Sequence, residues 1–339
     1  MSDWLSLLNR DPLPWLLSEG DPAVRHAALR SILDREEDDP EVRRARSAAM
    51  AEGPIAAILA AQHPEGYWVK PGPGYSPKYT GTVWQVIFLD QLGASGDDGR
   101  VRAACEYVLS HTQTDAGGFG ASYDESERRP PSSAMIHCLN GNLLRALIGF
   151  GWLEDNRVQR AVDWLACSVT GEGIGRYYRT GTTGPGFCCA ANEKLPCAWG
   201  AVKAMLGLAR IPSNKRAPQV ERAIRQGEDF LLSRDPAKAD YPVAWGKTKP
   251  SESWFKLGFP SGYVTDVLQI LEALCQAGAA GDPRLQPAVR WLLSKQDGQG
   301  RWRNQYAYNG KTWVEVEKQG QPSKWVTLRA CRVLKAVHV

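Results

Sequence analysis

Gln-Asp-Gly-Gln-Gly-Arg-Trp at residues 296–302 follows an amphipathic segment and has the form Gln-x-x-x-Gly-x-Trp. The same form occurs upstream as Gln-His-Pro-Glu-Gly-Tyr-Trp at 62–68. A variant at 113–119 has phenylalanine in place of the tryptophan. Each copy follows a helical pattern, turns at a glycine and ends on an aromatic residue. Three copies at corresponding points of helical hairpins indicate a repeat architecture.

Segments that are apolar on nearly every side alternate along the chain with amphipathic ones. Helices that are apolar all round lie inside a protein, and amphipathic helices lie at its surface. The apolar segments are 82–92, 139–150, 198–209, 263–277 and 325–337, and amphipathic partners include 98–112, 155–169, 219–233 and 285–295. With 21–33 counted as the first, there are six inner helices and about six outer ones.

This alternation predicts an all-α fold, an (α/α)6 toroid of about six helical hairpins. An inner and an outer ring of helices would enclose a central apolar cavity at one end. The whole chain, 1–339, would form one domain, with 1–19 as an N-terminal arm packed on it. The alternative is an open solenoid, because stacked helical pairs form rows as well as rings.

Composition and charge limit the classes of function. The net charge is +4 on 339 residues with acids and bases interspersed, which is too weak to predict a nucleic-acid partner. The start, Met-Ser-Asp-Trp-Leu, lacks the pattern of a signal peptide, and no apolar run approaches the ~18 residues of a transmembrane segment. We therefore expect a cytoplasmic protein whose eight cysteines are reduced. Peripheral contact with a membrane stays open.

The repeated motif, the inner and outer alternation and the six pairs resemble the squalene–hopene cyclase and protein prenyltransferase β-subunit superfamily. The resemblance covers about residues 20–339. It implies that the Gln and aromatic residues of the motif brace neighbouring outer helices. It also implies an isoprenoid substrate, although members of the superfamily cyclise terpenes, transfer prenyl groups or only bind.

The chain departs from the catalytic signatures of that superfamily. It has no Asp-x-Asp-Asp for protonating an alkene and no Asp-Asp-x-x-Asp for magnesium and diphosphate. It also lacks the Asp-x-Cys pair that holds zinc in prenyltransferases. The resemblance therefore predicts the scaffold and leaves the reaction open.

Asp266 is the best candidate for a catalytic acid. It stands in the apolar segment 263–277, where burial would raise the pKa of its carboxyl group and make it a proton donor. Capping is the alternative, because an anion is favourable in the first turn of a helix.

Four cysteines and one histidine form a candidate metal site. His137 and Cys138 begin one inner helix, Cys197 begins the next, and Cys188 and Cys189 precede it in the connecting loop. If both helices begin at the same rim, these side chains converge there, where a zinc or iron–sulfur centre would find thiolate ligands. Buried reduced cysteines, a reactive thiol and a redox disulfide are the alternatives, since the spacing is not the tight Cys-x2-Cys of common zinc sites.

Aromatic residues concentrate in the loops at the inner rim. Aromatic faces line apolar pockets and stabilise carbocations. The candidates for substrate binding are Tyr79, Trp84, Tyr178, Trp199, Trp254 and Tyr263.

We therefore expect a protein that binds and converts an isoprenoid or another apolar small molecule. Two alternatives stay open: a non-catalytic lipid-binding or interaction scaffold, and a polysaccharide-active toroid enzyme. The last would need paired carboxylates across the cavity.

Overall fold

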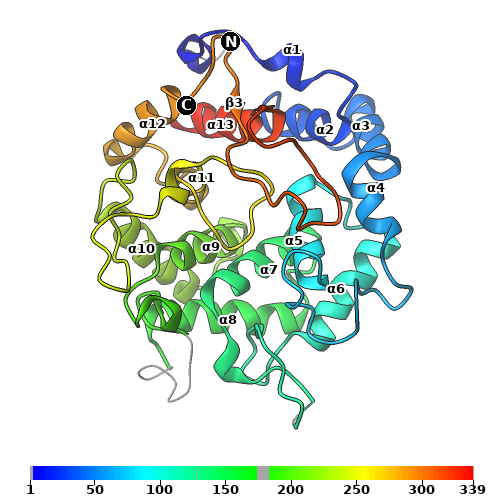
Figure 1. The fold of residues 1–339 in the computed structure, drawn as a ribbon, viewed down its shortest axis with the longest axis vertical. Helices are drawn as coiled ribbons and strands as arrows, with labels where there is room; N and C mark the ends of the chain where they lie inside the picture. The colour runs from blue at the N-terminus through cyan, green and yellow to red at the C-terminus, as the bar shows by residue number, and fades with distance from the viewer. Residues whose placement is uncertain (1–2, 127, 174–182, 339) are drawn as a thin grey trace.

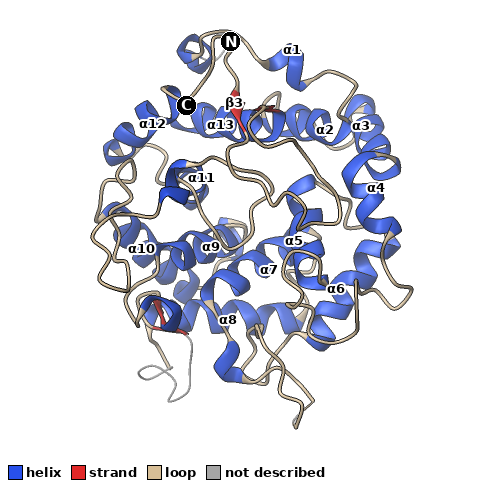
Figure 2. Cartoon of the chain, viewed as in Figure 1, coloured by secondary structure: helices blue, strands red, loops and turns tan. Residues whose placement is uncertain are grey.

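A computed structural model of the chain describes residues 3–126, 128–173 and 183–338, and these are almost entirely helical or looped (Figure 2). The inner helices are α2 (Pro22–Ser31), α5 (Thr82–Leu92), α7 (His137–Gly149), α9 (Ala198–Leu208), α11 (Val267–Ala277) and α13 (Lys324–Val337). The outer helices are α3 (Pro40–Ala51), α4 (Gly53–Ala60), α6 (Gly99–His111), α8 (Asn156–Thr170), α10 (Pro218–Leu232) and α12 (Gln286–Leu293). A short α1 (Leu13–Leu16) precedes them.

The remaining elements are short. Two antiparallel pairs of two-residue strands join β1 (Thr183–Gly184) to β2 (Cys188–Cys189) and β3 (Trp302–Arg303) to β4 (Pro322–Ser323). The 3-10 helices are η1 (Asp3–Leu7), η2 (Ser132–Ala134), η3 (Ala190–Asn192), η4 (Ser213–Lys215), η5 (Glu252–Phe255) and η6 (Pro283–Leu285). Within the described ranges, no helix is long and apolar enough to cross a membrane.

The helices form a closed ring, as Figure 1 shows. The inner helices from α2 to α11 each pack against an outer helix, α5, α7, α9, α11 and α13 pack in succession, and α13 also contacts α2. That last contact joins the end of the chain to its beginning. The predicted all-α toroid is therefore confirmed, and the open solenoid is wrong. The inner helices are buried nearly throughout: in α5 only Asp90 and Gln91 escape full burial.

The three copies of the glycine motif make equivalent contacts between successive outer elements. The Gln62 amide donates to the carbonyl of Arg100 at the start of α6, at 2.9 Å. The Gln113 amide donates to the carbonyl of Arg157 at the start of α8, at 2.6 Å. The Gln296 amide donates to the carbonyl of Leu7, at 3.2 Å. The N-terminal segment therefore occupies the place of an outer helix beside α13.

The motif requires glycine because the backbone has a positive φ angle there and because another helix lies too close for a side chain. Gly66 and Gly117 have positive φ angles of 93° and 98°. A Cβ atom on Gly117 would lie 2.8 Å from the carbonyl oxygen of Arg160 in α8. Only glycine adopts this conformation freely and leaves room for the neighbouring backbone.

Helices α7 and α9 approach each other closely, and this contact positions the site. Gly141 of α7 faces the backbone at Lys203 of α9, where a Cβ atom would clash with the main chain. Both helices begin at the same rim, so the side chains at their first turns meet.

The start of α11 differs from the sequence prediction. The apolar segment was expected to be helical from 263, but α11 begins at Val267. Asp266 has an extended backbone and is the N-cap, accepting a hydrogen bond from the backbone N–H of Gln269 at 2.8 Å. Residues 263–265 lie outside the helix because they precede its N-cap, Asp266.

Candidate functional site

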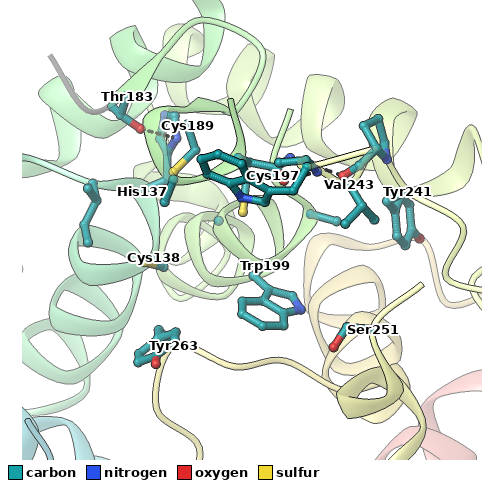
Figure 3. A pocket seen from close by; sticks show the side chains of 18 of the residues that line it. His137, Cys138, Thr183, Cys189, Cys197, Trp199, Tyr241, Val243, Ser251 and Tyr263 are labelled. Atoms are coloured by element: carbon teal, nitrogen blue, oxygen red, sulfur yellow. Dashed lines mark hydrogen bonds between the residues drawn. The ribbon is translucent and has the colours of Figure 1, made fainter. Parts of the chain in front are cut away.

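A cavity of about 450 Å³ opens beside the first turns of α7 and α9. Loop 241–251 closes one side, and Tyr75, Lys78 and Tyr263 form another. Figure 3 shows the thiols of this cavity above Trp199 and Tyr263, with Tyr241 and Val243 at the side. The volume is in the range of small-molecule sites.

Six aromatic residues line the cavity: Tyr75, Trp199, Tyr241, Trp245, Trp254 and Tyr263. The rings of Trp199 and Tyr263 lie 6.2 Å apart between centroids, and those of Trp199 and Trp254 lie 6.4 Å apart. Three of the predicted substrate-binding residues, Trp199, Trp254 and Tyr263, therefore line one cavity, and their role in binding stays a prediction.

Two other predicted aromatic residues support this wall from behind. The ring of Tyr79 packs against Trp84 at 5.0 Å, and the indole of Trp84 donates to the carbonyl of Tyr75 at 2.8 Å. Neither Tyr79 nor Trp84 lines the cavity. Tyr178 lies outside the described residues.

Three thiols face the cavity: Cys138 from α7, Cys189 from β2 and Cys197 from the N-cap of α9. The thiol of Cys197 donates to the sulfur of Cys189, and this hydrogen bond lowers the pKa of Cys189 to about 6. The same contact, followed by burial, raises the pKa of Cys197. Burial also raises the pKa of Cys138. Of the three thiols, only Cys189 has a lowered pKa.

His137 is buried at the wall of the cavity. Its Nδ1 lies 2.8 Å from the hydroxyl of Thr183. Burial lowers its pKa to about 4, so the ring is neutral at neutral pH.

The predicted metal ligands are only partly brought together. His137, Cys138, Cys189 and Cys197 line the cavity, whereas Cys188 does not. Among the described residues, no group of three or more His, Cys, Asp or Glu side chains is arranged to hold a metal ion. The zinc or iron–sulfur centre stays a prediction without support from this arrangement.

Asp266 lies apart from this cavity, among Gly258, Gln269 and Arg329. Burial raises the pKa of its carboxyl group, while Arg329, 3.9 Å away, acts to lower it. Its carboxylate accepts two backbone N–H groups, from Gly258 and Gln269. The structure thus gives Asp266 the capping contacts that were its alternative interpretation, and its role as an acid stays a prediction.

No Asp or Glu lines the described cavity, whereas Lys78 and Lys247 lie at its edge. The Lys78 ammonium group lies 5.0 Å from the ring centroid of Tyr263. The side chains of loop 241–251, among them Tyr241, Val243 and Ser251, were missed as site residues. That loop has no periodic pattern, and Trp245 is its only strong sequence signal.

No protein-family model and no curated protein matches the chain. Among solved structures, the chain resembles a polysaccharide lyase, with a TM-score of 0.51 and 12% identity over 98% of this chain and 96% of that one. It also resembles an unsaturated glucuronyl hydrolase specific for heparin, with a TM-score of 0.50 and 9% identity over 94% and 85%. At these identities, the likeness shows the fold alone.

A type II terpene cyclase, MstE from Scytonema, matches with 15% identity over 86% of this chain and 96% of that one. Its TM-score is 0.32, which is too low to carry an argument. The chemistry of this protein must therefore be argued from its own cavity.

Proposed function

We propose that this protein binds an apolar small molecule of isoprenoid type in the cavity beside α7 and α9 and converts it there. The observation that carries the proposal is an aromatic cavity of about 450 Å³ whose described lining contains thiols and no carboxylate. Such a wall favours apolar ligands, because it offers large faces and few groups that need a hydrogen bond.

Isoprenoids suit this wall better than sugars do. Branched unsaturated chains pack against flat rings such as Trp199 and Tyr263, and burial of apolar surface drives their binding. Sugars bring many hydroxyl groups, and each one that is buried needs a polar partner. The edge lysines, Lys78 and Lys247, suit an anionic head group on the apolar ligand.

The polysaccharide-active alternative draws on the fold likeness to a lyase and a hydrolase. Most glycoside hydrolases need two carboxyl groups flanking the scissile bond. The described lining supplies none, so this alternative lacks a local observation in its favour. The non-catalytic scaffold differs from our proposal only in turnover, and the three thiols in the cavity lining favour conversion.

Binding can be tested by titrating the protein with farnesol and, separately, with a glucuronate oligosaccharide, while tryptophan fluorescence is recorded. We expect saturable binding of farnesol and none of the oligosaccharide. Trp199→Ala should weaken farnesol binding at least tenfold, about 1.4 kcal/mol, because it removes a large contact face.

Trp152→Ala is the matched control, since Trp152 is half-buried, stacks with Arg102 and lies outside the cavity lining. It should bind farnesol as the unmodified protein does. Equal losses in both variants, or binding of the oligosaccharide alone, would contradict the proposal.

A further inference from the structure

A second, smaller cavity lies inside the ring, between the inner helices. Its volume is about 20 Å³, and α5, α7, α11 and α13 all contribute to its lining. The charged residues of the lining are Arg145, Arg329, Arg332 and Glu272, and we call this cavity the arginine pocket. Among the described residues, it has no lining residue in common with the larger cavity beside α7 and α9. The two are therefore separate sites.

Arg145 and Arg332 reach the arginine pocket from opposite sides of the ring. Arg145 belongs to α7 and Arg332 to α13. Two inner helices separate α7 from α13 in either direction around the ring, α5 and α2 on one side and α9 and α11 on the other (Figure 1). Because both arginines line the same small space, two positive charges approach each other across the centre of the molecule.

Arg329 and Glu272 neutralise each other. The guanidinium group of Arg329 donates to the two carboxylate oxygens of Glu272, at 2.9 Å from Nε and 2.6 Å from Nη2. Its third nitrogen, Nη1, donates to the carbonyl of Gly258 at 2.8 Å. A bidentate pair of this kind satisfies both partners. The carboxylate that lines the arginine pocket is therefore fully engaged, and the charges of Arg145 and Arg332 remain.

Arg145 and Arg332 have no bidentate partner of this kind. The Nε of Arg145 is buried and forms no hydrogen bond with any described residue. It lies 3.7 Å from a carboxylate oxygen of Asp90, beyond hydrogen-bond distance, and Asp90 is shared with Arg210 at 3.9 Å. Arg332 donates to neutral groups, among them the hydroxyl of Ser31 at 2.7 Å, and forms no ion pair within the described parts of the chain.

The charges around the arginine pocket do not balance. Four arginines face two carboxylates there, an excess of two positive charges: Arg145, Arg210, Arg329 and Arg332 against Asp90 and Glu272. The neighbouring pair Lys203 and Asp266 leaves the excess unchanged. Burial lowers the pKa of Arg332 to about 10, Glu272 opposes this and Arg145 adds to it. Charges removed from water without a counter-charge are costly, so this surroundings favours an anion.

We infer that the arginine pocket binds a small monovalent anion of the size of chloride, held between Arg145 and Arg332. A cavity of about 20 Å³ has room for a single water-sized particle, which excludes large organic anions. The bound anion would link α7 to α13 across the ring and stabilise the closed fold. This site goes beyond the proposed function, because it uses different residues and a different class of ligand.

Urea unfolding of the reduced full-length protein at pH 7 tests the inference. Sodium gluconate, whose anion is too large for the arginine pocket, is replaced stepwise by sodium chloride at constant ionic strength. We expect the folded protein to become more stable as chloride rises. Above the dissociation constant, each tenfold rise in chloride should raise the ratio of folded to unfolded protein about tenfold, because the anion binds only the folded state.

Arginine variants show where the anion binds. Arg145→Gln and Arg332→Gln should each lose the response to chloride, whatever their stability in gluconate. Arg216→Gln is the matched control, because Arg216 is a buried arginine that lies outside the arginine pocket and donates to the carbonyls of Ala209 and Ile211. It should keep the full response even if it is less stable. Comparing the two salts within each variant separates loss of the anion from general destabilisation.

Crystals grown in sodium bromide locate the ion by its anomalous scattering, and we expect a peak between Arg145 and Arg332. Equal stability in both salts, or a chloride response that both pocket variants retain, would overturn the inference. Bromide in the pocket without stabilisation in solution would mean an adventitious ion only and would overturn it too. Stabilisation by sulfate but not by chloride would overturn the size of the anion. Failure of farnesol binding leaves this site untouched, and loss of the anion leaves the proposed function untouched.

Discussion

His137 illustrates how burial alone sets the chemistry of a single residue. Its ring is enclosed between the start of α7 and Phe187, and its centroid lies 5.7 Å from that of the phenylalanine ring. Because protein replaces water around it, the neutral ring is favoured and the pKa falls to about 4. The sequence places this histidine beside Cys138 but does not reveal its partner, Thr183.

The stability of the protein should fall as the pH is lowered from 6.5 toward 4. In the unfolded chain His137 binds a proton near pH 6.5, whereas in the fold it does so only near 4, so acid favours unfolding. This one residue accounts for about 2.5 kcal/mol at pH 4.5. Between pH 7 and pH 4.5, the unfolding free energy of His137→Gln should therefore fall by about 2.5 kcal/mol less than that of the unmodified protein. Urea titrations at the two pH values measure this difference.

His63→Gln, a change at an exposed histidine, is the control and should keep the full loss. His26, whose pKa burial also lowers to about 4, contributes in all three proteins and cancels in the comparison. Identical acid sensitivity of His137→Gln and the unmodified protein would contradict this account.

Residues of the cavity could be predicted from the sequence where they belong to a recognisable helical pattern. Trp199 and Cys197 could be predicted because they stand at the start of an inner helix. Tyr241 could not, because its loop lacks periodicity and its ring is placed by contacts with Phe230 and Trp254. Asp266 was recognised, but whether it points to the cavity or to its own helix depends on where α11 begins.

At the scale of elements, the glycine motif joins one outer helix to the next. Gln113 reaches the start of α8, and Gly117 faces the backbone of Arg160 in that helix. The spacing of the motif was visible in the sequence. The resemblance implied that the motif braces neighbouring outer helices, but the partner atoms could not be predicted, because they are backbone carbonyls, which leave no mark on residue type.

Gly117→Ala should destabilise the protein more than Gly151→Ala. Both glycines have positive φ, 98° and 87°, so alanine is strained at either position by about 1 kcal/mol. Only Gly117 faces another helix closely, and the overpacking should cost about 2 kcal/mol more. Urea denaturation of the two variants measures the difference, and equal losses would show that the close contact is unimportant.

At the scale of the whole molecule, the N-terminal segment closes the outer ring of helices. The side-chain oxygen of Gln296 accepts a hydrogen bond from the backbone N–H of Asn9 at 2.8 Å, and Gly300 faces the backbone of Arg10. The order and number of inner helices could be predicted from their apolar surfaces. The place of residues 3–11 could not, because this segment is too short and irregular to show a helical period.

Gly300→Ala should release the N-terminal segment, whereas Gly310→Ala should not. The two glycines have nearly the same φ, 68° and 69°, but no atom of the described residues lies within 4 Å of a Cβ atom on Gly310. We expect faster amide hydrogen exchange at residues 3–11 in Gly300→Ala alone. Unchanged exchange there would mean that this contact does not hold the ring closed.

The most direct test of the central claim is a crystal structure of the protein with farnesol bound. The account predicts an isoprenoid chain in the cavity of about 450 Å³, packed against Trp199 and Tyr263. A chain bound elsewhere while the cavity holds only water would contradict it.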